Sequence, residues 1–197
     1  MNTSLSRELI NMAREDLQLR ATLAADGSLF NSYHPQMKAV HDRNAARLDE
    51  IVKAHGWPGK SKVGEEAAHA AWLILQHAIA HPDLQRKCFP LLVEQVEAGE
   101  ISPVDMAMLE DRIRCFEGRP QRFGTQFDWD EKKLMSPLPL DDISLVEERR
   151  KKIGLRPLKE EIIVKRKETA ESKEKPPVNY QSYILEKEQW LKANGWR

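Results

Sequence analysis

Apolar residues recur every three or four positions along most of the first 118 residues, a spacing that places side chains on one face of an α-helix. Helix-ending and helix-starting residues stand between these periodic stretches. Gly27 follows an expected helix over 4–25. Ser102 and Pro103 begin another, because serine caps a helix and proline fits its first turn. The pattern therefore predicts a mainly α protein, a helical bundle in a single domain.

The other elements are predicted in the same way. We expect further helices over 35–55, 64–80, 82–99, 103–118 and 142–153, and a terminal helix over 180–196. Residues 120–137 lose the helical period and predict a short β-hairpin or an ordered loop that bends at Gly124. We place the helical domain at residues 1–157. Residues 158–197 are expected to be a charged tail with a linker and the terminal helix.

Charge and composition exclude several classes of protein. The chain has 31 Lys+Arg and 31 Asp+Glu, whereas dedicated nucleic-acid binders usually carry a basic excess. No apolar run approaches the roughly 18 residues of a membrane span, and the N-terminus has no secretory-signal pattern. The chain has two cysteines, Cys88 and Cys115, and they lack CxxC spacing. Two such cysteines fit buried free thiols in a reducing compartment. We therefore predict a cytoplasmic protein without a membrane partner, and nucleic-acid binding is disfavoured.

Helical phase places polar residues on faces that are otherwise apolar. Asp16 lies at the centre of the first apolar stripe, and Arg20 lies at its edge. His41, Asn44 and His55 fall inside the second stripe. His77 points between apolar residues of the third helix, and Asp111 lies in the middle of a stripe on the fifth. Because burying an unpaired polar group costs roughly 2–7 kcal/mol, these groups should meet one another, water or a ligand.

Two interpretations of this polar interior stay open. The first is a structural network in which Asp16 pairs with Arg20 and the histidines bond to backbone. The second is a ligand pocket, since helical bundles build their sites from inward polar side chains.

Four separated motifs resemble a bacterial family, domain of unknown function 6624. They are Gly56-Trp57-Pro58, the run Ala71-Trp72-Leu73-Ile74 leading to Gln76-His77-Ala78, Asp111-Arg112-Ile113, and Gln121-Arg122-Phe123-Gly124-Thr125-Gln126. The resemblance extends from about Leu9 to Leu158 and includes Met37, Asn44 and the run Arg150–Leu155. The family usually has Tyr where this chain has Phe123. The resemblance implies no established activity.

The motifs share Asn44, His77 and Asp111 with the inward polar set, which favours the pocket interpretation. Gly124-Thr125-Gln126 is then interpreted as a loop that closes the pocket, with an ordinary hairpin turn as the alternative. The residues assigned to ligand binding are Asp16, Arg20, Asn44, Gln76, Arg112, Thr125 and Gln126.

The sequence favours an enzyme that uses acid–base chemistry on a small polar or anionic substrate. His77 and Asp111 are the predicted catalytic residues, because imidazole titrates near neutral pH and a carboxylate can orient it. Asp16, His41, His77 and Asp111 also form a mixed nitrogen and oxygen set that suits a metal. We nevertheless predict no metal and no cofactor.

The alternative is a non-catalytic regulatory module that binds a small molecule, a peptide or another protein. Gln76, Gln121 and Gln126 suit recognition of a polar ligand, and the terminal helix could dock on a protein partner.

Overall fold

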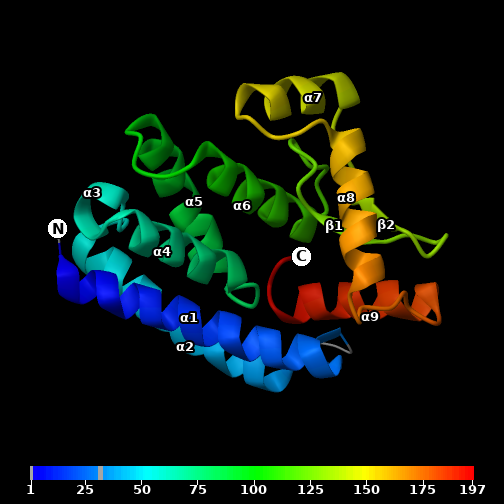
Figure 1. Ribbon diagram of the computed structural model, residues 1–197, viewed down its shortest axis with the longest axis horizontal. Coiled ribbons are helices and arrows are strands. Elements are labelled where there is room, and N and C mark those ends of the chain that lie inside the picture. The colour runs from blue at the N-terminus through cyan, green and yellow to red at the C-terminus, as the bar shows by residue number, and fades with distance from the viewer. Residues whose placement is uncertain (1, 31–32) are drawn as a thin grey trace. The chain divides into compact units, whose positions relative to one another are not determined.

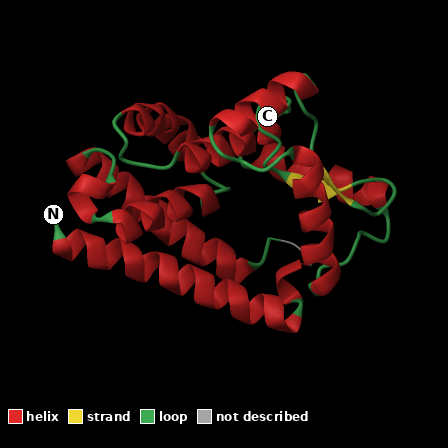
Figure 2. Cartoon of the chain, turned by 45° about the horizontal axis from the view of Figure 1, so that its top comes forward, coloured by secondary structure: helices red, strands yellow, loops and turns green. Residues whose placement is uncertain are grey.

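Helices form most of residues 2–30 and 33–197, which are the residues that this computed structural model describes (Figures 1 and 2). The prediction of a mainly α protein is confirmed. Contacts between residues divide the chain into two compact units, which we call the N-terminal unit (Met1–Met106) and the C-terminal unit (Ala107–Arg197).

The described part of the N-terminal unit consists of helices and the loops that connect them. Its elements are α1 (Thr3–Asp26), η1 (Ser28–Phe30), α2 (Pro35–His55), α3 (Lys60–Val63), α4 (Glu65–His77) and α5 (Pro82–Glu97), and α6 (Pro103–Phe116) contains the division between the units. Helix α1 packs along both α2 and α4 (Figure 1).

The predicted helix boundaries have the expected chemistry. The Asn2 side chain accepts a hydrogen bond from the backbone N–H of Leu5 at the start of α1. Gly27 ends α1 at φ +89°, a left-handed conformation that glycine adopts without a steric cost. Ser102 Oγ accepts from Val104 N–H at the start of α6.

Small and branched side chains let α4 approach α1 and α2 closely. Leu9, Ala45, Leu48, Ala71 and Leu75 are all at most 1% exposed. Alanine contributes little bulk, so the helix axes come near one another and the longer leucines fill the remaining space. His55 was expected inside this core but is exposed at the last turn of α2, beyond the buried stripe. That expectation was wrong.

The C-terminal unit combines a small sheet with three more helices. Strands β1 (Phe127–Trp129) and β2 (Met135–Pro137) pair antiparallel, with Asp128 opposite Ser136. The predicted hairpin therefore exists. Helices α7 (Ile143–Lys152), α8 (Leu158–Glu171) and α9 (Tyr180–Ala193) follow, and Asp142 caps α7 through the N–H groups of Ser144 and Leu145.

The last segment of the chain packs within the C-terminal unit. Leu191 and Trp196 are 1% and 3% exposed, and the Trp196 ring meets the Phe116 ring edge to face at 5.0 Å. Helix α8 contacts β2. That residues 1–157 form a domain by themselves stays a prediction.

Among the described residues, no helix combines the length and apolar character needed to cross a bilayer.

Candidate functional site

Three helices of the N-terminal unit bring Asp16, His41 and His77 together. Asp16 comes from the middle of α1, His41 from the second turn of α2 and His77 from the last residue of α4. Asp16 Oδ2 lies 2.9 Å from His77 Nδ1 and 3.4 Å from His41 Nε2. The two imidazole rings lie 5.3 Å apart between centroids. We call these three residues the Asp–His cluster.

The cluster is buried and incompletely hydrogen-bonded. Asp16 is 1% exposed and His41 is 7% exposed, whereas the side chain of His77 is 18% exposed. Asp16 Oδ1 and His41 Nε2 have no hydrogen-bond partner among residues 2–30 and 33–197. The 3.4 Å contact between His41 Nε2 and Asp16 Oδ2 is therefore not a well-formed hydrogen bond. Buried polar atoms are usually hydrogen-bonded, so the lack of a partner for these two atoms requires an explanation.

Tyr33 supports the buried histidine from the side opposite Asp16. Its hydroxyl lies 2.8 Å from His41 Nδ1, and the two rings stack at 5.7 Å. A hydrogen bond at one ring nitrogen fixes the tautomer and the orientation of an imidazole. Burial, followed by the charges of Asp42 and Asp16, raises the pKa of Tyr33 far above its usual value, so its hydroxyl stays protonated. Tyr33 was not predicted as a site residue, because it lies outside the periodic helical segments.

The charge of Asp16 is held by its two imidazole neighbours. Burial by itself raises the pKa of this carboxyl, but contacts with His41 and His77 outweigh burial and lower the pKa well below its usual range. The carboxylate is therefore ionised at neutral pH. Two imidazole nitrogens and one carboxylate oxygen meeting at one point can share a proton or bind a cation.

Other predicted residues of the N-terminal unit lie on the same helices with different exposure. Asn44, one turn after His41, is 1% exposed and donates its amide to the carbonyl of Met12 at 3.3 Å, and its Oδ1 has no partner among the described residues. Gln76 is buried beside His77 in the chain. Arg20 is exposed on α1, and the acid that it was expected to neutralise pairs with the histidines.

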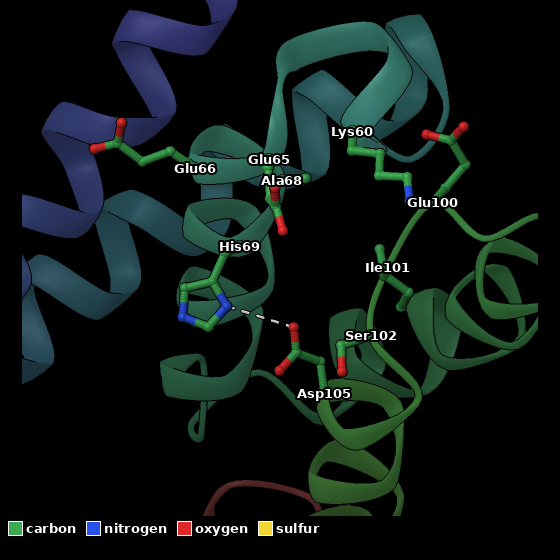
Figure 3. Close-up of a pocket in the computed structure, with 9 residues that line it drawn as sticks. All are labelled: Lys60, Glu65, Glu66, Ala68, His69, Glu100, Ile101, Ser102 and Asp105. Carbon is green, nitrogen blue, oxygen red and sulfur yellow. Dashed lines mark hydrogen bonds and ion pairs between the residues drawn. The ribbon is translucent and has the colours of Figure 1, made fainter. Parts of the chain in front are cut away.

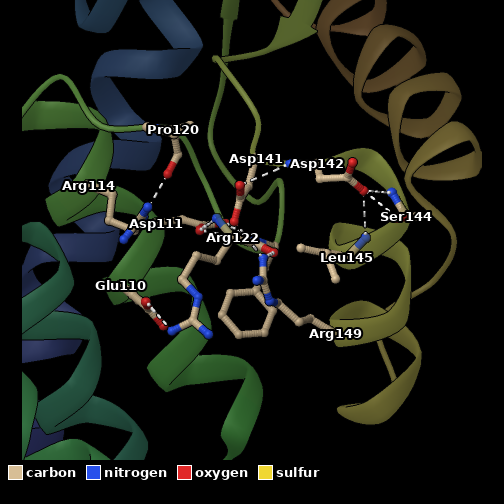
Figure 4. Close-up of polar contacts among 11 residues, drawn as sticks. Glu110, Asp111, Arg114, Pro120, Arg122, Asp141, Asp142, Ser144, Leu145 and Arg149 are labelled. Atoms are coloured by element: carbon tan, nitrogen blue, oxygen red, sulfur yellow. Dashed lines mark hydrogen bonds and ion pairs between the residues drawn. The ribbon is translucent and has the colours of Figure 1, made fainter.

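Asp111 belongs to the C-terminal unit, where it anchors a loop. Its carboxylate accepts a hydrogen bond from the backbone N–H of Arg122 (Figure 4). It also accepts from the backbone N–H groups of Phe123 and Thr125 and from the Thr125 hydroxyl. Burial raises the pKa of Asp111, and these donors lower it part of the way back. The neighbouring Glu110 pairs with the Arg122 guanidinium at 3.0 Å.

Arg150 anchors the same loop and was not among the predicted site residues. It is 1% exposed, and its guanidinium donates to the carbonyls of Phe123, Gly124 and Arg156. The only signal for it in the sequence was its place in the motif that begins at Arg150, since composition alone marks it as one charge in a basic run.

The predicted Gly-Thr-Gln segment is a tightly bonded loop. Gly124 has φ +65°, which confirms the expected bend. Gln126 N–H donates to Gln121 Oε1, and the Gln126 amide donates to the Met108 carbonyl and Thr125 Oγ1. Thr125 and Gln126 thus make internal contacts in the C-terminal unit. Arg112, next to Asp111 on α6, is partly exposed.

A separate cavity of about 420 Å³ lies in the N-terminal unit, at the start of α4 (Figure 3). Its lining is Lys60, Glu65, Glu66, Ala68, His69, Glu100, Ile101, Ser102 and Asp105. His69 Nδ1 and Asp105 Oδ2 lie 3.4 Å apart at its edge, with the His69 side chain 60% exposed. None of these residues was predicted to belong to a site.

Comparison with known proteins identifies a family. A family model matches residues 3–172 and is described as a family of unknown function, DUF6624. The chain belongs to this family, as the motifs predicted. No curated protein and no solved structure matches the chain.

Proposed function

We propose that this DUF6624 member is a cytoplasmic enzyme that performs acid–base chemistry on a small polar or anionic substrate, with His77 as the proton-transfer group. Asp16 orients the His77 imidazole. The unpaired state of Cys88 and Cys115, both buried, supports a reducing compartment.

The contact between Asp16 and His77 carries this proposal. A buried carboxylate 2.9 Å from Nδ1 holds the imidazole in one orientation and favours the tautomer with a proton on Nδ1. The other ring nitrogen then has the lone pair that accepts a proton. The 18% exposure of His77 supports access by a substrate, whereas Asp16 is nearly inaccessible. The pair therefore has the division of roles that general-base catalysis requires.

The orienting role that the sequence assigned to Asp111 passes to Asp16 in this proposal. Both oxygens of Asp111 accept hydrogen bonds from loop residues 122–125. Asn44 stays a proposed ligand-binding residue, because its Oδ1 is buried without a partner among the described residues.

A binding module without catalysis is the second candidate, and the cavity in Figure 3 supports it. Its volume of about 420 Å³ suits a small molecule, and acidic side chains predominate over the one lysine and one histidine in its lining. This composition favours a cationic ligand over the anionic substrate proposed above.

The test is a screen of ligand binding followed by a screen of turnover. Orthophosphate, glycerol phosphate, malate, glutamate, AMP and spermidine are added singly, and thermal stability is measured, since a ligand that binds the folded chain raises its melting temperature. Each stabilising compound is then incubated with the protein, and its conversion is followed by proton NMR.

The variant His77→Gln should keep the thermal response to the anionic compound and lose about 10²–10⁴-fold of the turnover. His81→Gln is the matched control, because His81 also faces an aspartate, Asp42, at 2.8 Å, but the pair is about one-third exposed. Equal turnover by wild type and His77→Gln would contradict the enzymatic proposal. Stabilisation by spermidine alone, without conversion of any compound, would favour the binding module.

A further inference from the structure

We infer that the Asp–His cluster is a binding site for a divalent transition-metal ion, with Asp16 Oδ2, His41 Nε2 and His77 Nδ1 as its protein ligands. This inference rests on the proposed function, because it adds an ion to the same three side chains. The ion would take the place of the proton that lies between His77 and Asp16 in the metal-free protein. With the ion bound, a water molecule on the ion would be the acid–base group of the site.

The distances between the three candidate ligand atoms fit one small ion. The atoms all lie within 4.8 Å of one another, and the two separations from Asp16 Oδ2 are 2.9 Å and 3.4 Å. Ligands that sit about 2.0–2.1 Å from a tetrahedral zinc ion are roughly 3.4 Å apart. Only small side-chain movements are therefore needed to place all three atoms in a first coordination shell.

The hydrogen bonding that is missing from the cluster points to the same ligand. Asp16 Oδ1 and His41 Nε2 belong to side chains more than nine-tenths buried, and neither atom has a hydrogen-bond partner among the described residues. An ion next to Asp16 Oδ2 would satisfy the lone pair of His41 Nε2 directly. It would also place a positive charge beside the buried carboxylate.

The chemistry of the donors selects the class of metal. Two imidazoles and one carboxylate suit Zn²⁺, Fe²⁺ or Mn²⁺, whereas Ca²⁺ and Mg²⁺ prefer sites made entirely of oxygen. Three protein ligands leave at least one coordination position for water or substrate. That arrangement is characteristic of catalytic rather than structural metal sites.

Tyr33 provides the outer-shell contact that such histidines usually have. With a proton on His41 Nδ1 donated to the Tyr33 oxygen at 2.8 Å, the lone pair of His41 lies on Nε2, the atom that faces Asp16. Tyr33 is therefore a positioning residue for the metal ligand, and its removal should weaken binding without removing a ligand.

The other histidine–carboxylate pairs of the N-terminal unit lack these features. His69 with Asp105 and His81 with Asp42 each contain one histidine, and their imidazoles are 60% and 35% exposed. In the described part of the chain, the Asp–His cluster is the set of three or more His, Cys, Asp or Glu side chains whose ligand atoms converge. The two surface pairs thus serve as internal controls.

The test is a titration of the full-length protein with Co²⁺ after dialysis against EDTA. We expect one equivalent to bind and to produce visible d–d absorption typical of four- or five-coordinate cobalt with nitrogen ligands. Zn²⁺ should displace it stoichiometrically. His41→Gln and His77→Gln should each weaken the affinity by more than 100-fold, and Tyr33→Phe by about 10–100-fold. His81→Gln should bind as the wild type does.

Three outcomes would overturn the inference. They are absence of saturable Co²⁺ absorption in the wild type, binding that survives both His41→Gln and His77→Gln, and equal loss in His81→Gln. If a cluster variant fails to fold, X-ray absorption of the Zn²⁺-loaded wild type decides instead, because two imidazoles must contribute to its scattering.

This titration needs no substrate, so it separates the metal from the proposed enzyme. Absence of metal binding together with turnover that depends on His77 would remove the ion and leave the acid–base proposal intact. Metal binding without turnover of any compound would support the ion and count against the acid–base proposal.

Discussion

Asp111 and Arg150 hold the backbone of the same loop residue, Phe123, one through its N–H and the other through its carbonyl. The Asp111 carboxylate accepts from Phe123 N–H at 3.1 Å, and the Arg150 guanidinium donates to the Phe123 carbonyl at 2.6 Å. Both charged side chains are at most 1% exposed. Two buried charges of opposite sign therefore hold the backbone between them, and the backbone amides separate them in place of a direct ion pair.

Replacing Asp111 should destabilise the protein. Asp111→Leu leaves three backbone N–H groups and the Thr125 hydroxyl without their acceptor, so we expect a loss of about 3 kcal/mol in the free energy of unfolding. Glu110→Gln is the control, because its partner Arg122 is 42% exposed and the pair should contribute less than about 1 kcal/mol. Urea unfolding measures both variants. A loss below 1 kcal/mol for Asp111→Leu would show that water replaces the carboxylate.

Arg150→Lys should also destabilise the protein, although it keeps the charge. An ammonium group cannot reach the carbonyls of Phe123, Gly124 and Arg156 together as the planar guanidinium does, so we expect a loss of about 2 kcal/mol. In a double-mutant cycle with Asp111→Leu, the combined loss should fall short of the sum by about 0.5–3 kcal/mol, because both residues hold one loop. Strict additivity would contradict the shared role.

Trp196 should be part of the core of the C-terminal unit. Trp196→Ala removes a 3% exposed ring that contacts Phe116, and we expect a loss of about 3–5 kcal/mol. Leu185→Ala, in α9 but 59% exposed, should change the stability by less than about 0.5 kcal/mol. Thermal and urea unfolding measure both. Equal, small effects would support residues 1–157 as a domain that is independent of the tail.

Both cysteines should be unreactive in the folded protein. Burial raises the pKa of each thiol from 9.0 to about 12, so at pH 8 almost none of either residue is thiolate. We expect no labelling of Cys88 or Cys115 by iodoacetamide at pH 8 in buffer, and two labels per chain in concentrated urea. Reactivity should rise only as the pH approaches 12. Rapid labelling of one cysteine in buffer would reveal local opening around it.

Helical phase placed four of the buried polar residues correctly, but it did not identify their partners. Asp16, His41, Asn44 and Asp111 were predicted to point inward, and each is at most 7% exposed. Phase along one helix is a local property, so the sequence determines it. The predicted pairing of Asp16 with Arg20 also involved residues close in the chain. It does not form, because two histidines from other helices contact the Asp16 carboxylate.

The motif residues show the same limit at a larger scale. Asp111 and the Gly124-Thr125-Gln126 loop were assigned to one pocket with His77, and Thr125 donates two hydrogen bonds to Asp111. Their assignment to a site shared with His77 depends on how distant segments approach, which no short-range pattern encodes. Tyr33 contacts His41, which belongs to the next helix, and Arg150 contacts the loop at Phe123 and Gly124. The periodicity of their own segments carries no trace of those contacts.

The sequence by itself determined the helical class, the ends of most helices, the hairpin and most of the polar side chains that turn inward, because propensity, capping and periodicity act between residues that are close in the chain. Only the tertiary structure decided that Asp16 meets His41 and His77, and that Asp111 and Arg150 hold one loop. Those contacts depend on the packing of helix faces against one another, where distances of a few ångströms determine whether two polar atoms interact.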